Sequence, residues 1–293
     1  MLNLHRLRLL HELAQRGTLA AVAEALGYSP STVSQQLSIL EREAGAELLA
    51  PEGRRVRLTA HGVALAAAGA ELLALEERTR VGLEVAQERL APVRVAVFQT
   101  AAHAILPGAL AALAASAPQL RVEVAVVPPE EGLAEVAARS FDLALAEQYP
   151  GRSRPLDAGL RRELLGLDPI RLALPPGDPA RGIADVADRA WVMEPAGTAA
   201  RDWSEQQCRA AGFEPDVRFV AEDLTAHARL IASGLAVGIL PGFALAGAER
   251  EVDAVDLPGS PHREIFTAVR AATGERPALV ALRGALAESF AAV

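Results

Sequence analysis

The chain has 293 residues, of which 51% are hydrophobic, so it is long enough to form two or three domains with sizeable cores. Its formal net charge is −8 and it contains no lysine, which argues against a protein that coats nucleic acid without regard to sequence. A single cysteine, Cys208, excludes an intrachain disulfide and a cysteine-rich metal site, and it fits a reducing cytoplasm.

The N-terminal segment predicts three helices in succession. The first spans residues 4–16 and places leucines on one side. A second helix follows Thr18 as N-cap and ends at Gly27, where a left-handed residue is favoured. Ser29 and Pro30 then begin a third helix as its N-cap and first residue. The buried face of this third helix recurs at helical spacing and consists of Val33, Leu37, Leu40 and Ala44.

The outer face of the third helix is rich in hydroxyl and amide groups, where a surface helix usually carries pairs of opposite charge. Such a face can bond to base edges in a DNA major groove without repelling phosphates, and Gln35 could pair with an adenine through two hydrogen bonds. The alternative is an ordinary helical hairpin with a polar exterior. The candidate DNA-contacting residues on this helix are Ser29, Pro30, Ser31, Thr32, Ser34, Gln35 and Ser38.

A short β-hairpin is predicted next, around Pro51 to Gly53, with Arg54, Arg55 and Arg57 at its tip and exit. A basic wing beside a polar helix can clamp phosphates, which favours the DNA-binding interpretation over the plain hairpin. Residues 1–62 contain seven arginines against six acidic residues, a net charge of +1. We therefore expect affinity for DNA to depend on local arginines and on several heads per assembly.

This N-terminal pattern resembles a known family. Residues 23–45 read A-x-x-L-G-Y-S-P-S-T-V-S-Q-Q-L-x-x-L-E-x-x-x-G, and residues 53–62 read G-R-R-V-R-L-T-x-x-G. Residues 2–62 thereby closely resemble the winged helix-turn-helix of LysR-type transcriptional regulators, and the remaining chain resembles that family in length and layout. The sequence departs from the family at Gln35 and Pro51, where arginines are usual, and at Leu49, where phenylalanine is usual. These departures concern base preference and phosphate affinity more than the fold.

From residue 59 to about residue 90 the pattern predicts one long helix, about 45 Å in length. Small or apolar residues recur in steps of three and four, and this heptad seam includes Leu65, Leu72 and Leu75 in its first half. A small winged domain cannot bury such a seam, so we expect the helix to pair with its copy in a second subunit. The alternative is packing on the chain's own C-terminal domain.

After Ala91 and Pro92 the sequence alternates between strand and helix patterns. Strands are predicted at 93–98, 120–127, 142–146, 170–174, 190–193, 217–220, 236–239 and 264–269. Helices are predicted at 102–116, 129–139, 183–188, 198–211, 224–233 and 277–291. A Gly/Arg/Pro-rich link at 151–160 separates two similar halves. We interpret them as two parallel-sheet lobes joined by crossings near 160–166 and 262–268, which resemble the periplasmic-binding-protein-like effector domain of the LysR family.

The predicted fold class is therefore α+β and multidomain. It consists of an N-terminal winged helix-turn-helix, a long linker helix and a two-lobed α/β periplasmic-binding-protein-like effector domain. The expected ranges are 1–58 for the DNA-binding domain, 59–90 for the dimerisation helix and 91–293 for the effector domain. Within the effector domain, lobe 1 is expected at about 91–162 and 267–293, and lobe 2 at about 163–266.

Ligands of such open sheets bind beyond the carboxyl ends of the strands, in the crevice between lobes. Thr100 and Thr198 stand at strand-to-helix junctions, where a hydroxyl and backbone N–H groups could hold a carboxylate, although each could equally be a plain N-cap. Glu147 and Asp223 could receive a ligand ammonium group, but solvated loop acids are the commoner case. The candidate effector-binding residues are Gln99, Thr100, Pro128, Gln148, Tyr149, Gly197, Thr198, Asp223 and Leu224.

Other classes of function fit the sequence less well. The stretches 101–120 and 230–248 lack charges, but prolines interrupt both, so we interpret them as buried segments rather than membrane spans. There is no signal-peptide pattern, which a secreted solute-binding protein would need. No nucleophile elbow, metal-spaced His/Asp set or Walker loop occurs, and His103 and His227 are expected to be structural. Since Cys208 also has no obvious base, we expect no catalytic site, no cofactor and no metal.

The expected function is that of a cytoplasmic, bacterial, ligand-responsive regulator that binds promoter DNA. We expect its effector to be a small anionic or amino-acid-like metabolite. The resemblance further implies a homodimer that assembles into a homotetramer, a dimer of dimers, whose heads bind half-sites about one DNA turn apart. RNA polymerase is a candidate further partner.

Overall fold

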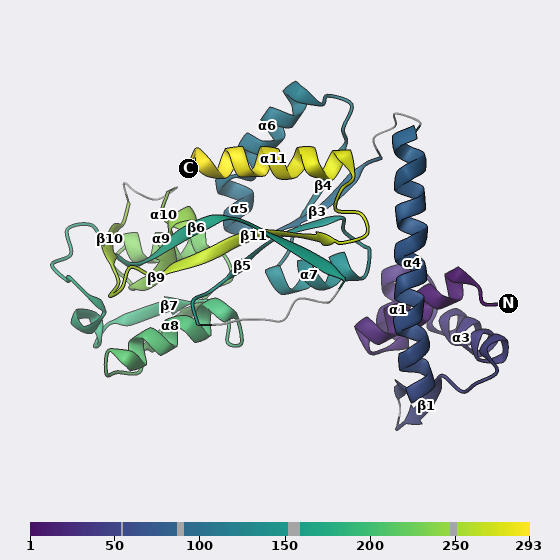
Figure 1. The fold of residues 1–293 in the computed structure, drawn as a ribbon. Helices are drawn as coiled ribbons and strands as arrows, with labels where there is room; N and C mark the ends of the chain where they lie inside the picture. The colour runs from purple at the N-terminus through teal and green to yellow at the C-terminus, as the bar shows by residue number, and fades with distance from the viewer. Residues whose placement is uncertain (54, 87–90, 152–158, 247–250) are drawn as a thin grey trace.

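The computed structural model describes the chain except for residues 54, 87–90, 152–158 and 247–250. An N-terminal head is followed by one long helix and then by an α/β domain (Figure 1). Within the described ranges, no helix combines the length and apolar character that a membrane span needs. The predicted wing residue Arg54, the end of the predicted linker helix and most of the predicted link at 151–160 lie outside the described residues.

The head has the predicted helices and hairpin, because the local capping signals act as expected. Thr18 Oγ1 accepts a hydrogen bond from Ala21 N at 3.2 Å, and Ser29 Oγ accepts one from Thr32 N at 3.1 Å. Gly27 ends the second helix in the left-handed conformation, with φ of 69°. The elements are α1 (Leu4–Arg16), α2 (Leu19–Leu26), α3 (Pro30–Ala44), β1 (Leu49–Glu52) and β2 (Arg55–Leu58).

The third helix also positions the hairpin that follows it. Its inner residues Val33, Leu37 and Leu40 are fully buried, as the spacing predicts. Farther along the helix, the Glu41 carboxylate accepts hydrogen bonds from the backbone N–H groups of Leu48 and Leu49, at 2.9 and 3.1 Å. The hairpin strands β1 and β2 are antiparallel. One acidic side chain thus fixes the hairpin against the C-terminal end of α3.

The long helix α4 (Ala60–Ala86) stands beside the head, and one of its faces packs on α1 (Figure 1). Ala66 and Leu73 are buried on this face. The predicted heptad seam faces α1 only in part. Leu65 is half-buried against the head, whereas Leu72 and Leu75 are 43% and 52% exposed. The helix therefore carries an apolar stripe that its own subunit leaves uncovered.

Ion pairs connect the head and α4 to the C-terminal domain. Arg16 of α1 lies between Glu12 and Glu135, with its Nη1 2.6 Å from Glu135 Oε1. Its hydrogen bonds lower the pKa of Glu135. On α4, Glu77 lies 3.0 Å from the Arg270 guanidinium and 3.5 Å from that of Arg139. Packing of α4 on its own C-terminal domain therefore does occur, through charge and away from the apolar stripe.

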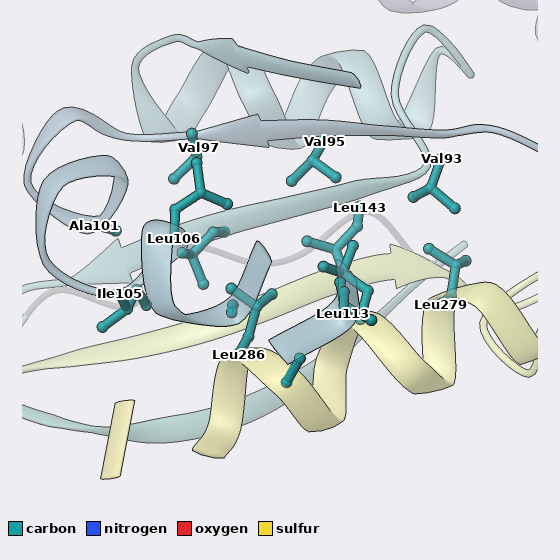
Figure 2. Close-up of a cluster of buried hydrophobic side chains, with 14 of the residues drawn as sticks. Val93, Val95, Val97, Ala101, Ile105, Leu106, Leu113, Leu143, Leu279 and Leu286 are labelled. Atoms are coloured by element: carbon teal, nitrogen blue, oxygen red, sulfur yellow. The ribbon is translucent and has the colours of Figure 1, made fainter. Parts of the chain in front are cut away.

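The first lobe of the α/β domain is a sheet with strands in the order β6-β11-β5-β3-β4. Helices α6 and α11 lie on one face of the sheet and α7 on the other (Figure 1). Figure 2 shows how Val95 and Val97 of β3 and Leu143 of β5 meet Leu286 of α11 in a continuous apolar core. The elements are β3 (Val93–Val97), α5 (Gln99–Ala104), α6 (Leu106–Ser116), β4 (Val122–Val126), α7 (Pro129–Ala137), β5 (Leu143–Gln148), β6 (Leu160–Leu174), β11 (His262–Arg270) and α11 (Pro277–Ala291).

The second lobe is built around the buried ring of Trp191, which packs with Trp203 and Met193. Strand β6 pairs with β9 and β10, while β7 pairs with β8 and bridges to the chain before β9 at Val237. The elements are a short 3₁₀ turn η1 (Ile183–Val186), β7 (Ala190–Met193), α8 (Ala199–Ala210), β8 (Asp216–Val220), α9 (Leu224–Ala232), β9 (Gly238–Pro241), α10 (Gly242–Leu245) and β10 (Asp253–Asp256).

The expectation of two parallel-sheet lobes is wrong for the strands near the crossings. Strand β6 runs antiparallel to β11 over residues 160–169 and antiparallel to β9 and β10 over residues 170–174. The strand thus changes partners near Pro169, and the chain returns to lobe 1 at His262, a few residues away from the predicted lobe limits at 162 and 267. Charged residues in β6 hide its strand pattern, and Arg162 is paired across the sheet with Gln148 and Glu264.

Smaller differences have local causes. The helix predicted at 102–116 is two helices, α5 and α6, joined at Ile105, because Pro107 at the start of α6 has no N–H to continue the first helix. Strand β10 and helix α10 are not among the predicted elements, because β10 begins and ends with aspartate and α10 is a single turn of four residues. The closing helix α11 has the predicted bounds.

Gly62 is a sensitive position in the head. A Cβ atom there would lie 2.1 Å from the Leu48 backbone oxygen, so Gly62→Ala must displace either the wing or α4. We expect this variant to lose about 1–3 kcal/mol of unfolding free energy in urea denaturation. The control is Gly69→Ala in the same helix, where the nearest atom would be Leu7 Cβ at 3.5 Å. Equal stabilities of the two variants would contradict this packing.

Candidate functional site

The outer face of α3 presents the polar side chains expected from the sequence. Ser31, Ser34, Gln35 and Ser38 are exposed, and Thr32 is half-buried. The hydroxyl of Ser29 contacts those of Ser31 and Thr32, each at 2.8 Å, so three hydroxyls at the start of the helix form one hydrogen-bonded group. Pro30 occupies the first position of the helix. The geometry suits a helix whose N-terminal half approaches a polar surface.

The wing is the hairpin of β1 and β2, which Glu41 holds against the C-terminal end of α3. Arg57 is exposed on β2, and Arg55 begins the same strand. The hairpin turns at Gly53, whose φ of 59° is a left-handed conformation that favours glycine. Cationic side chains on a wing can contact phosphates while the helix contacts bases.

A second candidate site is a cavity of about 400 Å³ between the lobes of the α/β domain. It lies beyond the carboxyl ends of β3, β4 and β7, as expected for ligand sites in such sheets. Its lining residues are Phe98, Gln99, Thr100, Val126, Val127, Pro128, Pro129, Glu130, Glu147, Glu194, Pro195, Thr198, Ala199, Ala200, Glu222, Asp223, Leu224 and Arg263. A volume of this size suits a small metabolite.

The deepest charged residue in this cleft is Arg263 of β11, which is 1% exposed. Its Nε donates to Asp168 at 2.7 Å, its Nη1 donates to Glu147, and its Nη2 donates to Thr100 Oγ1 at 2.9 Å. Asp168 in turn accepts a hydrogen bond from the backbone N–H of Phe243 in lobe 2, at 3.1 Å. We name Thr100, Glu147, Asp168 and Arg263 the hinge cluster, because it joins β5, β6, β11, α5 and α10 where the lobes meet.

Burial dominates the electrostatics of the hinge cluster. It raises the pKa of Glu147 and of Asp168, and the positive charge of Arg263 opposes both shifts. Because the Arg263 guanidinium already donates to three side chains of its own chain, it is held in place as a structural cation rather than being available for a ligand carboxylate.

A pair of hydrogen bonds crosses the mouth of the cleft. Gln99 of α5 in lobe 1 donates through Nε2 to Asp223 Oδ1 at 2.6 Å, and its Oε1 accepts from Leu224 N at 3.1 Å. The Asp223 side chain also accepts from Thr225 N at 2.7 Å, as the N-cap of α9. Gln99 therefore bridges the two lobes directly.

The structure places six of the nine candidate effector-binding residues in the cleft lining: Gln99, Thr100, Pro128, Thr198, Asp223 and Leu224. The other three have different contacts. Gln148 accepts a hydrogen bond from Arg162 at 2.8 Å, and Tyr149 is buried against Trp203. Gly197 forms the turn before α8, with φ of 91°. Their role in effector binding remains a prediction.

Three charged residues of the site could not be predicted from local sequence patterns. Arg263, Asp168 and Glu194 lie far apart in the chain, and only the folded sheet brings the first two together. Glu147, expected to be a solvated loop acid, instead lies in β5 next to its last residue and is largely buried against Arg263. Arg263 directly precedes the strand predicted at 264–269, and that position carries no sign of burial.

The other titratable residues singled out in the sequence have structural surroundings. His227 is buried in α9, its Nε2 is 2.8 Å from the Ala221 carbonyl oxygen, and burial lowers its pKa. Cys208 is buried in α8, and burial raises the pKa of its thiol to about 12. A thiol in this environment stays protonated and is a poor nucleophile. His103 is exposed on α5.

Comparison with protein families gives two matches that divide the chain as the structure does. Residues 4–63 match the model of the bacterial regulatory helix-turn-helix protein, lysR family, and residues 86–291 match that of the LysR substrate binding domain.

Curated relatives include a probable hydrogen peroxide-inducible genes activator of Mycobacterium avium, 29% identical over 82% of this chain and 78% of the relative. The transcriptional dual regulator GltC of Bacillus subtilis is 24% identical over 82% of this chain and 81% of the relative.

Solved structures share the fold over nearly the whole length. Full-length OxyR from Pseudomonas aeruginosa covers 99% of this chain and 95% of its own, with a TM-score of 0.66 and 21% identity. CbnR in complex with its target DNA covers 99% of this chain and 100% of its own, with a TM-score of 0.55 and 23% identity. At these identities the likeness is one of fold.

The hinge cluster makes a prediction about stability. Arg263→Met leaves Asp168 and Glu147 buried without their cation, and we expect a loss of about 3–5 kcal/mol in urea denaturation. The matched control is Arg171→Met on β6, whose partner Asp256 is 71% exposed, and we expect it to lose about 0–1 kcal/mol. Similar small losses in both variants would show that the buried cluster does not support the fold.

Proposed function

Because the chain belongs to the LysR family of bacterial transcriptional regulators, we propose that it binds promoter DNA through its head and a small-molecule effector in its interlobe cleft. DNA binding by the head is supported by the exposed hydroxyl and amide face of α3 together with the arginine-bearing wing. Such a face can read base edges while the wing contacts the backbone. Binding to promoters on chromosomal DNA would require the protein to be in the bacterial cytoplasm.

The exposed stripe on α4 supports pairing of two subunits. Leu72 and Leu75 lie on one side of a helix of about seven turns, and a monomer would leave both in water. Pairing of two α4 helices would cover the stripe and bring two heads onto a site with two half-sites, about one DNA turn apart. We further propose that two such dimers join through their effector domains, and that RNA polymerase is a later partner.

The ion pairs between head and effector domain supply a physical route from effector to DNA. Helix α7 begins at Pro129, which lines the cleft. In the last turn of the same helix, Glu135 forms an ion pair with Arg16 of the head. Glu77 of α4 is paired with Arg270 of β11, the strand that also carries Arg263. An effector that favours one arrangement of the lobes would therefore also favour one placement of the head, to the extent of its differential affinity.

Two other activities find no support in these residues. A peroxide response, as the relatives' names suggest for them, would need a reactive thiolate, whereas Cys208 is buried with a raised pKa. The described residues that line the cleft include no serine, cysteine, lysine or histidine that could act as a nucleophile beside a base, so we propose binding without conversion.

Gln35→Ala tests the reading role of α3. We expect the full-length variant to relax base preference at one position of each half-site, at a cost of about 1–3 kcal/mol for the preferred base. Selection of bound duplexes from a random pool measures this preference. Gln206→Ala, which removes an exposed glutamine from α8, is the control and should keep the wild-type preference. Uniform weakening on all sequences by Gln35→Ala would rule out a reading role.

Leu72→Asp tests the role of the stripe. The charge would sit inside the paired helices, so we expect folded monomers in sedimentation velocity where the wild type gives dimers or larger species. The control is Val63→Asp, which also adds a charge to an exposed apolar site of α4, but about 180° around the helix from Leu72. Dimers that persist in Leu72→Asp would place the subunit interface elsewhere.

A further inference from the structure

We infer that the interlobe cleft binds a small organic cation, an amine or a guanidine with a hydrocarbon body. The inference rests on the proposed function, in which the cleft is the effector site, and it names the chemical class of the effector. The sequence suggested a small anionic or amino-acid-like metabolite, and the lining favours the ammonium end of such a molecule over the carboxylate. Four features of the lining support this: an excess of carboxylates, an arginine already paired within its own chain, an acidic first turn of α7 beside threonine hydroxyls that already have partners, and an apolar wall.

The carboxylates come from both lobes. Among the described residues that line the cavity, the acidic ones are Glu130, Glu147, Glu194, Glu222 and Asp223, and the basic one is Arg263. Arg263 is neutralised within the hinge cluster, because it is paired with both Glu147 and Asp168. Glu130 has an interaction of its own within the chain, whereas Glu194, Glu222 and Asp223 add negative charge to the cavity wall. The described lining contains no second arginine, so the field in the cleft favours positive charge.

The helix ends around the cavity are poor anion sites. The N-terminal turn of α7 begins with Pro128 and Pro129, which have no N–H to donate, and Glu130 and Glu131 follow in the same turn. At α8, Thr198 Oγ1 accepts from Arg201 N at 3.2 Å and donates to the Pro195 carbonyl at 3.0 Å.

Two backbone donors at α9 are occupied, and the Thr100 hydroxyl has a partner as an acceptor. At α9, Leu224 N donates to Gln99 and Thr225 N to Asp223. Thr100 is 4% exposed, and its hydroxyl accepts from Arg263. The hydroxyls of Thr100 and Thr198, which the sequence suggested as part of a carboxylate cradle, therefore each have a partner in their own chain.

Glu194 is the carboxylate best placed to respond to a cation. It follows β7 at the cavity wall and is shielded from water, and burial together with the nearby Glu147 raises its pKa to about 7. The groups that face it are Glu130 of α7, Glu147 of β5, Arg263 of β11 and Thr198 of α8. A bound ammonium or guanidinium would favour the ionised form of Glu194, so binding would release a proton near neutral pH.

The rest of the wall is hydrocarbon, which suits an organic cation better than a bare metal ion. Val126, Pro128 and Pro195 line the cavity with the ring of Phe98. The full set lies within residues 86–291, which match the substrate binding domain of the family. An aliphatic or flat body could pack on this wall while its charged end meets the carboxylates.

Isothermal titration calorimetry on the full-length chain tests the inference with three sets of probes at constant ionic strength. The cations are putrescine, agmatine and L-arginine methyl ester, the anions are succinate and benzoate, and the metals are magnesium and calcium chloride. We expect at least one organic cation to bind more tightly than every anion and metal. Glu194→Gln should weaken that binding by about 10- to 100-fold, because one charge-assisted contact is lost.

The pH dependence separates a direct role of Glu194 from a structural one. With a pKa of about 7, the dissociation constant of the cation should fall about tenfold between pH 6 and pH 8, since the ionised carboxylate is the binding form. Glu194→Gln should remove this dependence. The control Glu275→Gln neutralises an exposed carboxylate paired with Arg161 and should behave like the wild type.

Three results would overturn the inference: tighter binding of the carboxylates or metals than of any amine, no binding of any cation, or a Glu194→Gln variant with wild-type affinity. None of these would contradict the proposed function, which the base preference of Gln35→Ala tests independently. If the wild type showed no sequence-selective DNA binding, the proposed function would be contradicted, but the inference about the chemical class of the ligand would not be affected.

Discussion

The buried guanidinium of Arg263 is the interaction on which the arrangement of the effector domain depends. It joins Glu147, Asp168 and Thr100 at the point where β6 and β11 pass between lobes, and Asp168 extends the network to the backbone of α10. A buried cation of this kind needs partners, and each of the three nitrogens of this guanidinium donates to a side chain of its own chain. The hinge between the lobes is thus built on an ion-pair network, to which Phe243 of α10 adds an apolar contact with the lobe 1 core, while each lobe also has an apolar core of its own.

This commitment of Arg263 also decides what the cleft can bind. Because Arg263, the one arginine among the described lining residues, is paired within its own chain, the excess carboxylates and the proline-capped α7 leave an acidic cavity with an apolar wall. The same α7 is ion-paired at its far end with Arg16 of the head, and β11 is ion-paired with α4 through Arg270. Cleft, hinge and head are therefore connected by charged contacts rather than by one continuous apolar core, an arrangement that small changes in lobe position could shift.

The sequence predicted the head and the layout of the α/β domain well, because their signals are local. Caps at Thr18 and Ser29, left-handed glycines and the spacing of Val33, Leu37 and Leu40 each act within a few residues. The antiparallel pairing of β6 and the hinge cluster could not be predicted in this way. Arg263 and Asp168 are 95 residues apart, and a charged residue gives no sign of its partner until the sheet brings them together. The error about Glu147 has the same origin, since its burial depends on that distant arginine.

The central claim is that occupation of the cleft changes how the head contacts DNA. A DNase I footprint of the full-length protein on a duplex recovered by selection tests this claim most directly, with and without the amine that binds best in calorimetry. We expect the amine to change the protected length or the position of hypersensitive bands. At the same concentration, the amine should leave the footprint of the Glu194→Gln variant unchanged. An identical footprint with the cleft empty and saturated would contradict the coupling between the two sites.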